Sequence, residues 1–134
     1  MDLYAEHILD HYHHPLGKGK LATPTVVHEE RNESCGDDLA IELTVEGDII
    51  MAVRWQGEGC AVSQAAMSML SEKLEHMRTE DAAALKPNDI REMLRVPIGP
   101  RRTKCALLSL HALKNALLKL HHKPSQSWAE TLGE

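Results

Sequence analysis

The pattern of apolar and polar positions is clearest in the middle of the chain, where it predicts two strands. Apolar residues alternate with polar ones over 39–45 and again over 49–56, and this period of two is typical of a strand with one buried face. Residues 46–48, with a glycine at their centre, separate the two runs and predict a hairpin turn. Residues 25–30 show a weaker strand pattern. Together these segments predict a three-stranded antiparallel meander.

Apolar residues spaced three or four apart predict helices on both sides of this meander. One helix is expected before Pro15, and two short ones over 80–85 and 89–94. Two longer helices are expected over 61–77 and 103–121. The last of them carries an apolar stripe that should face the sheet, made of Ala106, Leu110, Leu113, Leu117 and Leu120. This order predicts an α+β fold, with an N-terminal helix, a three-stranded antiparallel sheet and then helices packed on one face of that sheet.

Several side chains at the helix ends look suited to capping. Asp2, Thr79 and Asn88 are expected to cap the first helix and the two short helices. The spacing within the first helix places Ile8 and Tyr12 on one apolar face.

The length of 134 residues predicts one domain with a core of its own. We assign residues 1–124 to this domain, because no internal repeat or linker interrupts them. Residues 125–134 are polar and follow a proline, and we expect them to form a flexible C-terminal tail.

Composition and charge narrow the choice of partners and compartment. Hydrophobic residues make up 43% of the chain, and the core must be aliphatic because phenylalanine is absent. The formal net charge of −5 argues against binding to nucleic acid through phosphate contacts. The chain has no apolar run of membrane-spanning length, and its first residues have neither the basic start nor the apolar core of a signal peptide. We therefore expect a cytoplasmic protein with no nucleic-acid or membrane partner.

The three cysteines, Cys35, Cys60 and Cys105, are the main candidates for chemistry. They cannot all pair with one another in one chain, and in a reducing cytoplasm cysteines more often bind metal or react. None of them belongs to a CxxC motif, so their spacing alone is a weak metal signal. Each could instead be a small buried apolar residue.

Two of these cysteines lie where a helix is expected to begin, a position that favours a thiolate over a thiol. Cys60 follows Gly57-Glu58-Gly59, and glycines there let the backbone turn tightly or approach a ligand closely. Cys105 follows the basic segment 101–104, whose cations also favour a thiolate.

The remaining cysteine, Cys35, lies in a polar loop, two residues before an aspartate. In Cys35-Gly36-Asp37 one tight turn can present a thiolate and a carboxylate to a single ion. Three thiolates and a carboxylate suit zinc or iron. A carboxylate matches these metals less well than a fourth thiolate, so a bound cluster should be easier to release. Asp37 could also be a simple turn former that bonds its own backbone.

Four short stretches form an ordered set across about residues 4–120: Tyr4 with Ile8-Leu9-Asp10-His11-Tyr12 and Pro15, then Cys35-Gly36-Asp37, then Gly57-Glu58-Gly59-Cys60-Ala61-Val62-Ser63, and finally Cys105-Ala106-Leu107-Leu108. This set resembles the U-type iron–sulfur cluster assembly family, which includes IscU, SufU and the N-terminal domain of NifU. The resemblance implies a SufE/NifU-like form of the α+β fold predicted above.

The resemblance also implies a function, for which three hypotheses stay open. The first is a non-enzymatic scaffold that receives sulfur from a cysteine desulfurase, builds a transient [2Fe–2S] cluster on Cys35, Asp37, Cys60 and Cys105, and passes it to apo-proteins. The second is a zinc-dependent sulfurtransferase of the SufU kind, in which Zn²⁺ occupies the same four groups and one thiolate accepts the persulfide sulfur. The third is a structural zinc module.

The chain departs from both branches of the family at points that bear on its partners. Lys104 stands before the third cysteine, where IscU-type members have a histidine, and this is similar to the SufU pattern. Residues 96–100 replace the proline–valine–lysine chaperone motif, which counts against a specialised Hsp70 partner. The segment between Cys60 and Cys105 leaves no room for the insertion that SufU proteins carry.

The sulfur acceptor is predicted to be Cys35. Its polar loop, with Gly36 next to it, should move more freely than a helix start, and reach across an interface requires such freedom. The SufU resemblance points to the same residue. Cys105 is the rival, because Arg102 and Lys104 could stabilise its thiolate.

Overall fold

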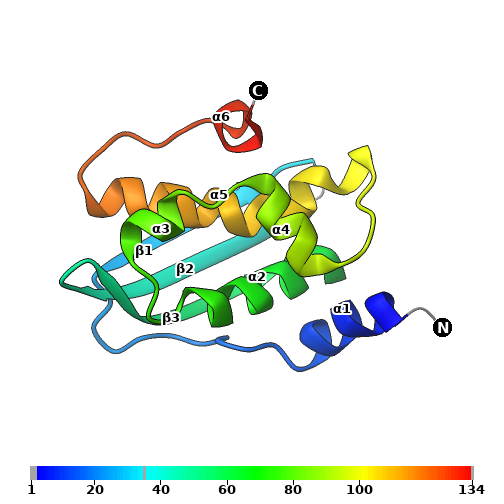
Figure 1. Ribbon diagram of the computed structural model, residues 1–134, viewed down its shortest axis with the longest axis horizontal. Helices are drawn as coiled ribbons and strands as arrows, with labels where there is room; N and C mark the ends of the chain where they lie inside the picture. Colours follow the sequence, from blue (N-terminus) through cyan, green and yellow to red (C-terminus); the bar gives the residue numbers. More distant parts are fainter. Residues whose placement is uncertain (1–2, 35, 134) are drawn as a thin grey trace.

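The computed structural model describes residues 3–34 and 36–133 and confirms the predicted α+β fold (Figure 1). Three strands form one antiparallel sheet in the order β1-β2-β3. They are β1 (Val26–Asn32), β2 (Asp37–Glu46) and β3 (Ile49–Glu58). The predicted meander is therefore present, with the hairpin turn at Gly47 and Asp48.

The helices gather on one face of this sheet, as expected (Figure 1). In chain order the helical elements are α1 (Leu3–His13), α2 (Ala61–Leu74), α3 (Thr79–Ala83), α4 (Pro87–Leu94), the 3₁₀ turn η1 (Pro100–Arg102), α5 (Thr103–Leu120) and α6 (Trp128–Leu132). Helix α5 packs on β1 and β2, while α2 packs on β3 and is covered on its other side by α1. Among the described residues, no helix combines the length and apolar character that crossing a bilayer requires.

The core lies between the sheet and the helix pair α2–α5. Leu110, Leu113 and Leu117 of the predicted stripe are buried there against the inner face of the strands. Trp55 of β3 is fully buried, and its indole Nε1 donates a 2.8 Å hydrogen bond to the carbonyl of Leu16. Because α2 and α5 pack closely on the strands, the ends of these elements are held in fixed positions around the core.

The strand limits differ from the expected ones in a way that matters for the site. Residues 31–38 were expected to form a loop, but Asn32 ends β1 and Asp37 begins β2, and the two are paired across the sheet. The turn between them is closed by a 2.9 Å hydrogen bond from the Gly36 N–H to the Asn32 carbonyl. Gly36 has a left-handed φ of 74°, which a glycine adopts without strain. Asp37 is thus fixed by the ladder rather than carried on a free loop.

Some local expectations about the helices were wrong. Tyr12 is 40% exposed, and the apolar face of α1 is buried through Ile8 instead. Arg78 and Lys86, not Thr79 and Asn88, are the N-cap residues of α3 and α4. Helix α4 begins with a proline in its first turn, a position where the missing N–H costs nothing. The predicted start of this helix, at residue 89, was therefore two residues too late. The predicted cap Asp2 lies outside the described residues.

The segment expected to be a tail contains helix α6, which lies against α5 (Figure 1). Asn115 of α5 exchanges two hydrogen bonds with the backbone of Gln126, at 2.7 and 3.3 Å. His111 Nδ1 lies 2.6 Å from the Thr131 hydroxyl. These buried polar contacts hold the C-terminal segment along the helix that carries Cys105.

Candidate metal centre

Three of the four predicted ligand residues come together at one end of the molecule. Asp37 is the first residue of β2, Cys60 is the N-cap of α2, and Cys105 lies in the first turn of α5. One ligand atom from each residue lies within 4.8 Å of the others. Because every one of them sits at the end of an element, the group forms without interrupting the core. In the described part of the chain, this is the one group of three or more such side chains with this spacing.

Asp37 and Cys60 are linked directly. The backbone N–H of Cys60 donates a 3.0 Å hydrogen bond to Oδ1 of Asp37. The second carboxylate oxygen, Oδ2, lies 3.8 Å from the Cys60 sulfur. A carboxylate is favoured at a helix N-terminus, where it accepts otherwise unpaired N–H groups. One oxygen therefore fixes the orientation of Asp37, and the other faces the thiol.

Gly59 makes this close approach feasible. A Cβ atom on Gly59 would collide with the Asp37 carboxylate, at both Oδ1 and Cγ. Its φ of 156° is also one that residues with side chains rarely adopt. Gly59 thus allows the backbone before Cys60 to lie close to the side chain of Asp37, one of the predicted metal-binding residues.

Cys105 is only 4% exposed and has Asn32 as a neighbour. The side-chain amide of Asn32 points its Nδ2 at the Cys105 sulfur, at 3.9 Å. The Asn32 Oδ1 also accepts a 3.3 Å hydrogen bond from the Ser34 N–H. Asn32 thus connects the turn after β1 to the thiol on α5, and an amide N–H aimed at sulfur is suited to holding a thiolate ligand in place.

Asn32 was missed by the sequence analysis. It is a single polar residue at the end of a weakly patterned strand, and it belongs to none of the motifs. The one available signal was its position three residues before Cys35, which places it at the start of the turn.

Cys35 lies outside the described residues, so its place in this group stays a prediction. Its sequence neighbours Ser34 and Gly36 belong to the turn that joins Asn32 to Asp37.

One pair of donors has a spacing close to that around a tetrahedral metal ion. Around zinc, with Zn–S of about 2.3 Å and Zn–O of about 2.1 Å, a tetrahedral sulfur–oxygen pair is separated by roughly 3.6 Å. The observed separation between Cys60 Sγ and Asp37 Oδ2 is 3.8 Å. Two thiolates and a carboxylate leave one position to fill. Cys60 is the more exposed of the two described thiols, so the group is open to solvent on its side.

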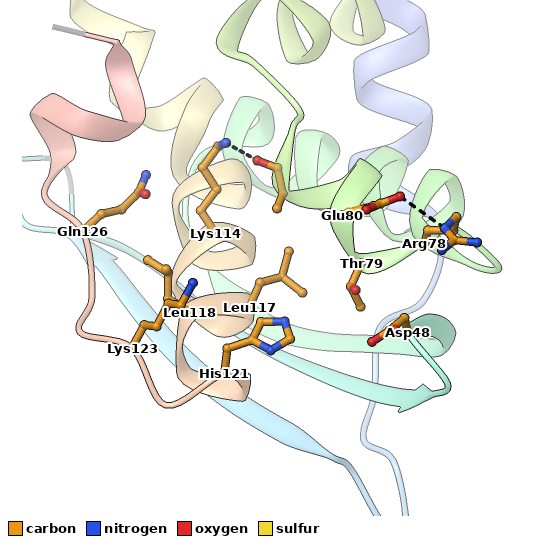
Figure 2. Close-up of a pocket in the computed structure, with 11 residues that line it drawn as sticks. Asp48, Arg78, Thr79, Glu80, Lys114, Leu117, Leu118, His121, Lys123 and Gln126 are labelled. Carbon is orange, nitrogen blue, oxygen red and sulfur yellow. Dashed lines mark hydrogen bonds and ion pairs between the residues drawn. The ribbon is translucent and has the colours of Figure 1, made fainter.

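A separate cavity of about 430 Å³ lies between α3 and the C-terminal half of α5 (Figure 2). Its lining includes Thr79, Lys114, Leu117 and His121. Asp37, Cys60 and Cys105, which we call the metal group, do not line this cavity. The cavity is therefore not part of the candidate metal centre.

Comparison with known proteins agrees with the geometry. The family described as NifU-like N terminal domain matches residues 3–127. The chain belongs to this family. The resemblance read from the four sequence stretches is thereby confirmed.

The chain is similar to proteins from both the IscU and the SufU branches of the family. The iron–sulfur cluster assembly scaffold protein IscU of Thermotoga maritima is 31% identical, over 88% of this chain and 94% of its own length. The zinc-dependent sulfurtransferase SufU of Bacillus subtilis is also 31% identical, over 87% of this chain and 90% of its own. The IscU scaffold of Escherichia coli is 28% identical, over 85% of this chain and 91% of its own.

Solved structures give the same result for the fold. A crystal structure from Fervidobacterium islandicum, described as an iron–sulfur cluster assembly scaffold protein for the SUF system, superposes with a TM-score of 0.75 and 27% identity. The match covers 84% of this chain and 94% of the other. The N-terminal part of a NifU-like protein from Brucella abortus has a TM-score of 0.75 at 18% identity, which shows the shared fold alone.

Proposed function

We propose that this protein is an iron–sulfur cluster assembly scaffold. It receives sulfur from a cysteine desulfurase, builds a transient [2Fe–2S] cluster on Cys35, Asp37, Cys60 and Cys105, and passes it to apo-proteins. The observation that carries this proposal is the convergence of Asp37, Cys60 and Cys105 from three separate elements to within 4.8 Å. Membership of the NifU-like family and the similarity to IscU scaffolds support the same function.

The individual residues have distinct tasks in this proposal. Cys60, half-buried at a helix start, is a thiolate ligand that remains reachable from solvent. Cys105 is a buried thiolate ligand that Asn32 holds in place. Asp37 supplies a weaker oxygen ligand, which keeps the site able to release its cargo. The cytoplasm is the compartment we propose, since thiolate ligands stay available in a reducing environment.

Sulfur transfer requires a thiolate that can reach another protein. The acceptor thiolate attacks the terminal sulfur of the desulfurase persulfide, the S–S bond breaks, and the desulfurase cysteine leaves as a thiolate. This transfer is redox neutral. Converting the accepted sulfur into the sulfide of a cluster then takes two electrons per sulfur, which ferrous iron and an added thiol reductant supply together. Cys105 is poorly placed for this attack because it is 4% exposed. We therefore keep Cys35 as the proposed acceptor and Cys105 as its rival.

A zinc-dependent sulfurtransferase is the second candidate function. Lys104 directly before Cys105 favours it, as does the similarity to SufU of Bacillus subtilis. In this case Zn²⁺ would be held by the same four groups, and its role would be to keep the thiolates deprotonated and grouped until one is needed. Both candidates use the same residues and the same sulfur donor, and they differ in what remains bound afterwards.

A structural zinc module is the least consistent with the structure. The main core extends from Ile8 to Leu117 and is built from buried aliphatic side chains and Trp55. The metal group lies at one end of it, at element termini. Removal of metal should therefore leave the far-ultraviolet circular dichroism spectrum unchanged and the thermal unfolding cooperative. A structural module would instead unfold when excess chelator is added.

Anaerobic assembly and transfer test the function. The protein is incubated with a cysteine desulfurase, cysteine, ferrous iron and a thiol reductant, which supplies the remaining electrons for sulfide formation, and then an apo-ferredoxin is added. A scaffold should develop the visible absorption of a [2Fe–2S] cluster and then lose it to the ferredoxin. Stimulated desulfurase turnover with bound zinc and no cluster would support the sulfurtransferase instead. If the protein accepted sulfur neither when supplied with iron nor when loaded with zinc, both candidates would be contradicted.

A further inference from the structure

The cavity between α3 and the C-terminal half of α5 is separate from the metal group (Figure 2). Its volume of about 430 Å³ falls within the range of small-molecule sites, roughly 300–1,000 Å³. Leu117 in its lining comes twelve residues after Cys105 on the same helix. A helix rises about 1.5 Å per residue, so the two lie about 18 Å apart along its axis. A ligand in this cavity would therefore not touch the metal group.

Three separate segments form the walls of this cavity, and hydrogen bonds tie them together. The backbone N–H of Thr79, at the start of α3, donates a 2.8 Å bond to the carbonyl of Asp48, in the turn between β2 and β3. The ammonium of Lys114, on α5, donates a 2.8 Å bond to the carbonyl of Ala83, at the end of α3 (Figure 2). Because these bonds link all three segments, the cavity is preformed.

Part of the lining is apolar. Leu117 and Leu118 of α5 contribute hydrocarbon to it, together with Ala83 of α3. Leu117 is 3% exposed and belongs to the main core, so its position is fixed by packing. A surface of this kind favours a ligand that has a hydrocarbon part.

The charges around this apolar surface favour an anion. The cations of the lining are Arg78, Lys114 and Lys123, and the carboxylates are Asp48 and Glu80. Nε of Arg78 lies 3.5 Å from Oε1 of Glu80, so these two charges largely compensate each other. Two lysines then stand against one aspartate, in a chain whose formal net charge is −5. The cavity is therefore a local exception to the acidic character of the protein.

Two polar groups of the lining are able to bind such a ligand directly. Lys114 has further N–H donors besides the one that bonds Ala83. Burial lowers the pKa of Lys114 below its ordinary value of 10.5, and the Asp89 carboxylate only partly opposes this. An anion beside this ammonium would replace the hydration that burial removes. Thr79 is 7% exposed, and no hydrogen bond of its hydroxyl is found in the part of the chain that the structure describes.

We propose that this cavity binds a small organic anion, with its charged group at Lys114 and Thr79 and its hydrocarbon part on Leu117. This site goes beyond the proposed scaffold function and uses none of its ligands. Carboxylates and phosphate monoesters share the required chemistry, which is a negative oxygen group on a short hydrocarbon. Lysine is a compact point charge that pairs with either group.

Nuclear magnetic resonance titration of the whole isotope-labelled chain tests this proposal. Hexanoate or hexyl phosphate should shift the amide signals of Thr79, Ala83 and Leu117, and the tighter ligand identifies the charged group. Hexylammonium has the same hydrocarbon with the opposite charge and should bind roughly tenfold more weakly or worse. Acetate has no hydrocarbon chain and should also bind roughly tenfold more weakly or worse.

Substitutions in the lining assign the contacts. Lys114→Met should weaken binding of the tighter ligand roughly tenfold, because a charged hydrogen-bond partner is lost. Thr79→Val should weaken it by a smaller factor. Asp48→Asn should strengthen it, because a like charge is removed, and asparagine tolerates the left-handed φ of 65° at this position.

Lys119→Met is the matched control. Lys119 lies on the same helix and also donates a hydrogen bond to a backbone carbonyl, that of Val27 at 2.7 Å. It does not line the cavity. Lys119→Met should therefore bind the ligand as wild type does, and both lysine variants should keep wild-type zinc binding at the metal group.

Several results would overturn this inference. They are no shift with either anion at millimolar concentration, equal binding of hexylammonium, and wild-type affinity in Lys114→Met. Weaker anion binding in Asp48→Asn would show that the charge preference is the reverse of the one proposed. Anion binding in a protein that assembles no cluster would overturn the scaffold function and leave this site standing.

Discussion

Oδ1 of Asp37 accepts a 3.0 Å hydrogen bond from the backbone N–H of Cys60, across 23 residues of sequence. The contact joins the start of β2 to the start of α2 and leaves the other oxygen of Asp37 facing the Cys60 sulfur. Asp37 therefore has two roles in the structure and in the proposed function. It fixes the backbone at Cys60, and it offers a ligand oxygen of moderate strength.

These two roles predict opposite effects of Asp37→Ala. The metal-free protein should lose about 2 kcal/mol of unfolding free energy, because the Cys60 N–H loses a charged partner. A bound [2Fe–2S] cluster should nevertheless transfer more slowly to an apo-ferredoxin, because the weak oxygen ligand is gone. Urea unfolding measures the first effect and the decay of visible absorption measures the second.

Asp38→Ala is the matched control for this variant. Asp38 is exposed, its Oδ1 accepts a 3.3 Å hydrogen bond from the Glu58 backbone N–H, and it does not belong to the group of Asp37, Cys60 and Cys105. It should transfer the cluster at the wild-type rate. Equal cluster lifetimes in wild type and Asp37→Ala would contradict a tuning role for the carboxylate.

Gly59→Ala should damage the site through a single methyl group. The added Cβ would collide with the Asp37 carboxylate, so either the carboxylate or the Cys60 backbone must move. We expect a loss of about 2 kcal/mol in unfolding free energy and weaker zinc binding in a chelator competition. Gly99→Ala has open space around the new methyl group and should change neither quantity. Wild-type zinc affinity in Gly59→Ala would show that this close approach is not needed for the metal centre.

Comparing the sequence-based predictions with the structure shows which features could be predicted and which could not. The meander and α5 were predictable because alternation and helical spacing extend over whole elements, so one misplaced residue does not hide them. Asp37, Cys60 and Cys105 were predictable because each lies at a boundary between two such patterns. Asn32 has no pattern of its own, and only the folded turn brings it to the Cys105 sulfur.

The C-terminal helix shows a second limit. Residues 125–127 are polar and α6 has only five residues, too few for helical spacing to be visible. What positions this helix are long-range contacts such as His111 with Thr131 and Asn115 with Gln126. Tyr12 illustrates the reverse error, because helical spacing alone does not reveal that α2 covers only part of α1.

His111 should make the stability of the protein depend on pH. Burial lowers the pKa of His111 below its ordinary value of 6.5, and the Glu30 carboxylate only partly opposes this. The unfolded chain therefore takes up a proton at a higher pH than the folded chain does. Stability contributed by neutral His111 is complete above the unfolded value and is lost as the pH falls below it.

Urea unfolding between about pH 7.5 and pH 5.5 measures this linkage. His111→Gln should give a shallower fall in unfolding free energy over that range than wild type, whatever its absolute stability. His14→Gln changes an exposed histidine and should keep the wild-type slope. A wild-type slope in His111→Gln would mean that another group carries the pH dependence.

Peptide mass spectrometry can identify the sulfur acceptor. Each Cys→Ser variant is mixed with a desulfurase and cysteine, and the added sulfur mass is located after digestion. Cys35→Ser should abolish the persulfide, whereas Cys105→Ser should retain it, because Cys105 is buried beside Asn32. Persulfide that persists in Cys35→Ser and disappears in Cys105→Ser would identify the buried thiol as the acceptor.

The central claim is that one group of ligands, which includes Asp37, Cys60 and Cys105, holds a transient iron–sulfur cluster. Iron and acid-labile sulfide are measured per chain after anaerobic assembly with a desulfurase, in wild type and in Cys60→Ser and Cys105→Ser. We predict iron and sulfide in equal amounts in wild type, and loss of both in each variant. Iron and sulfide retained at wild-type levels in both variants, or zinc alone in the wild type after assembly, would contradict the account.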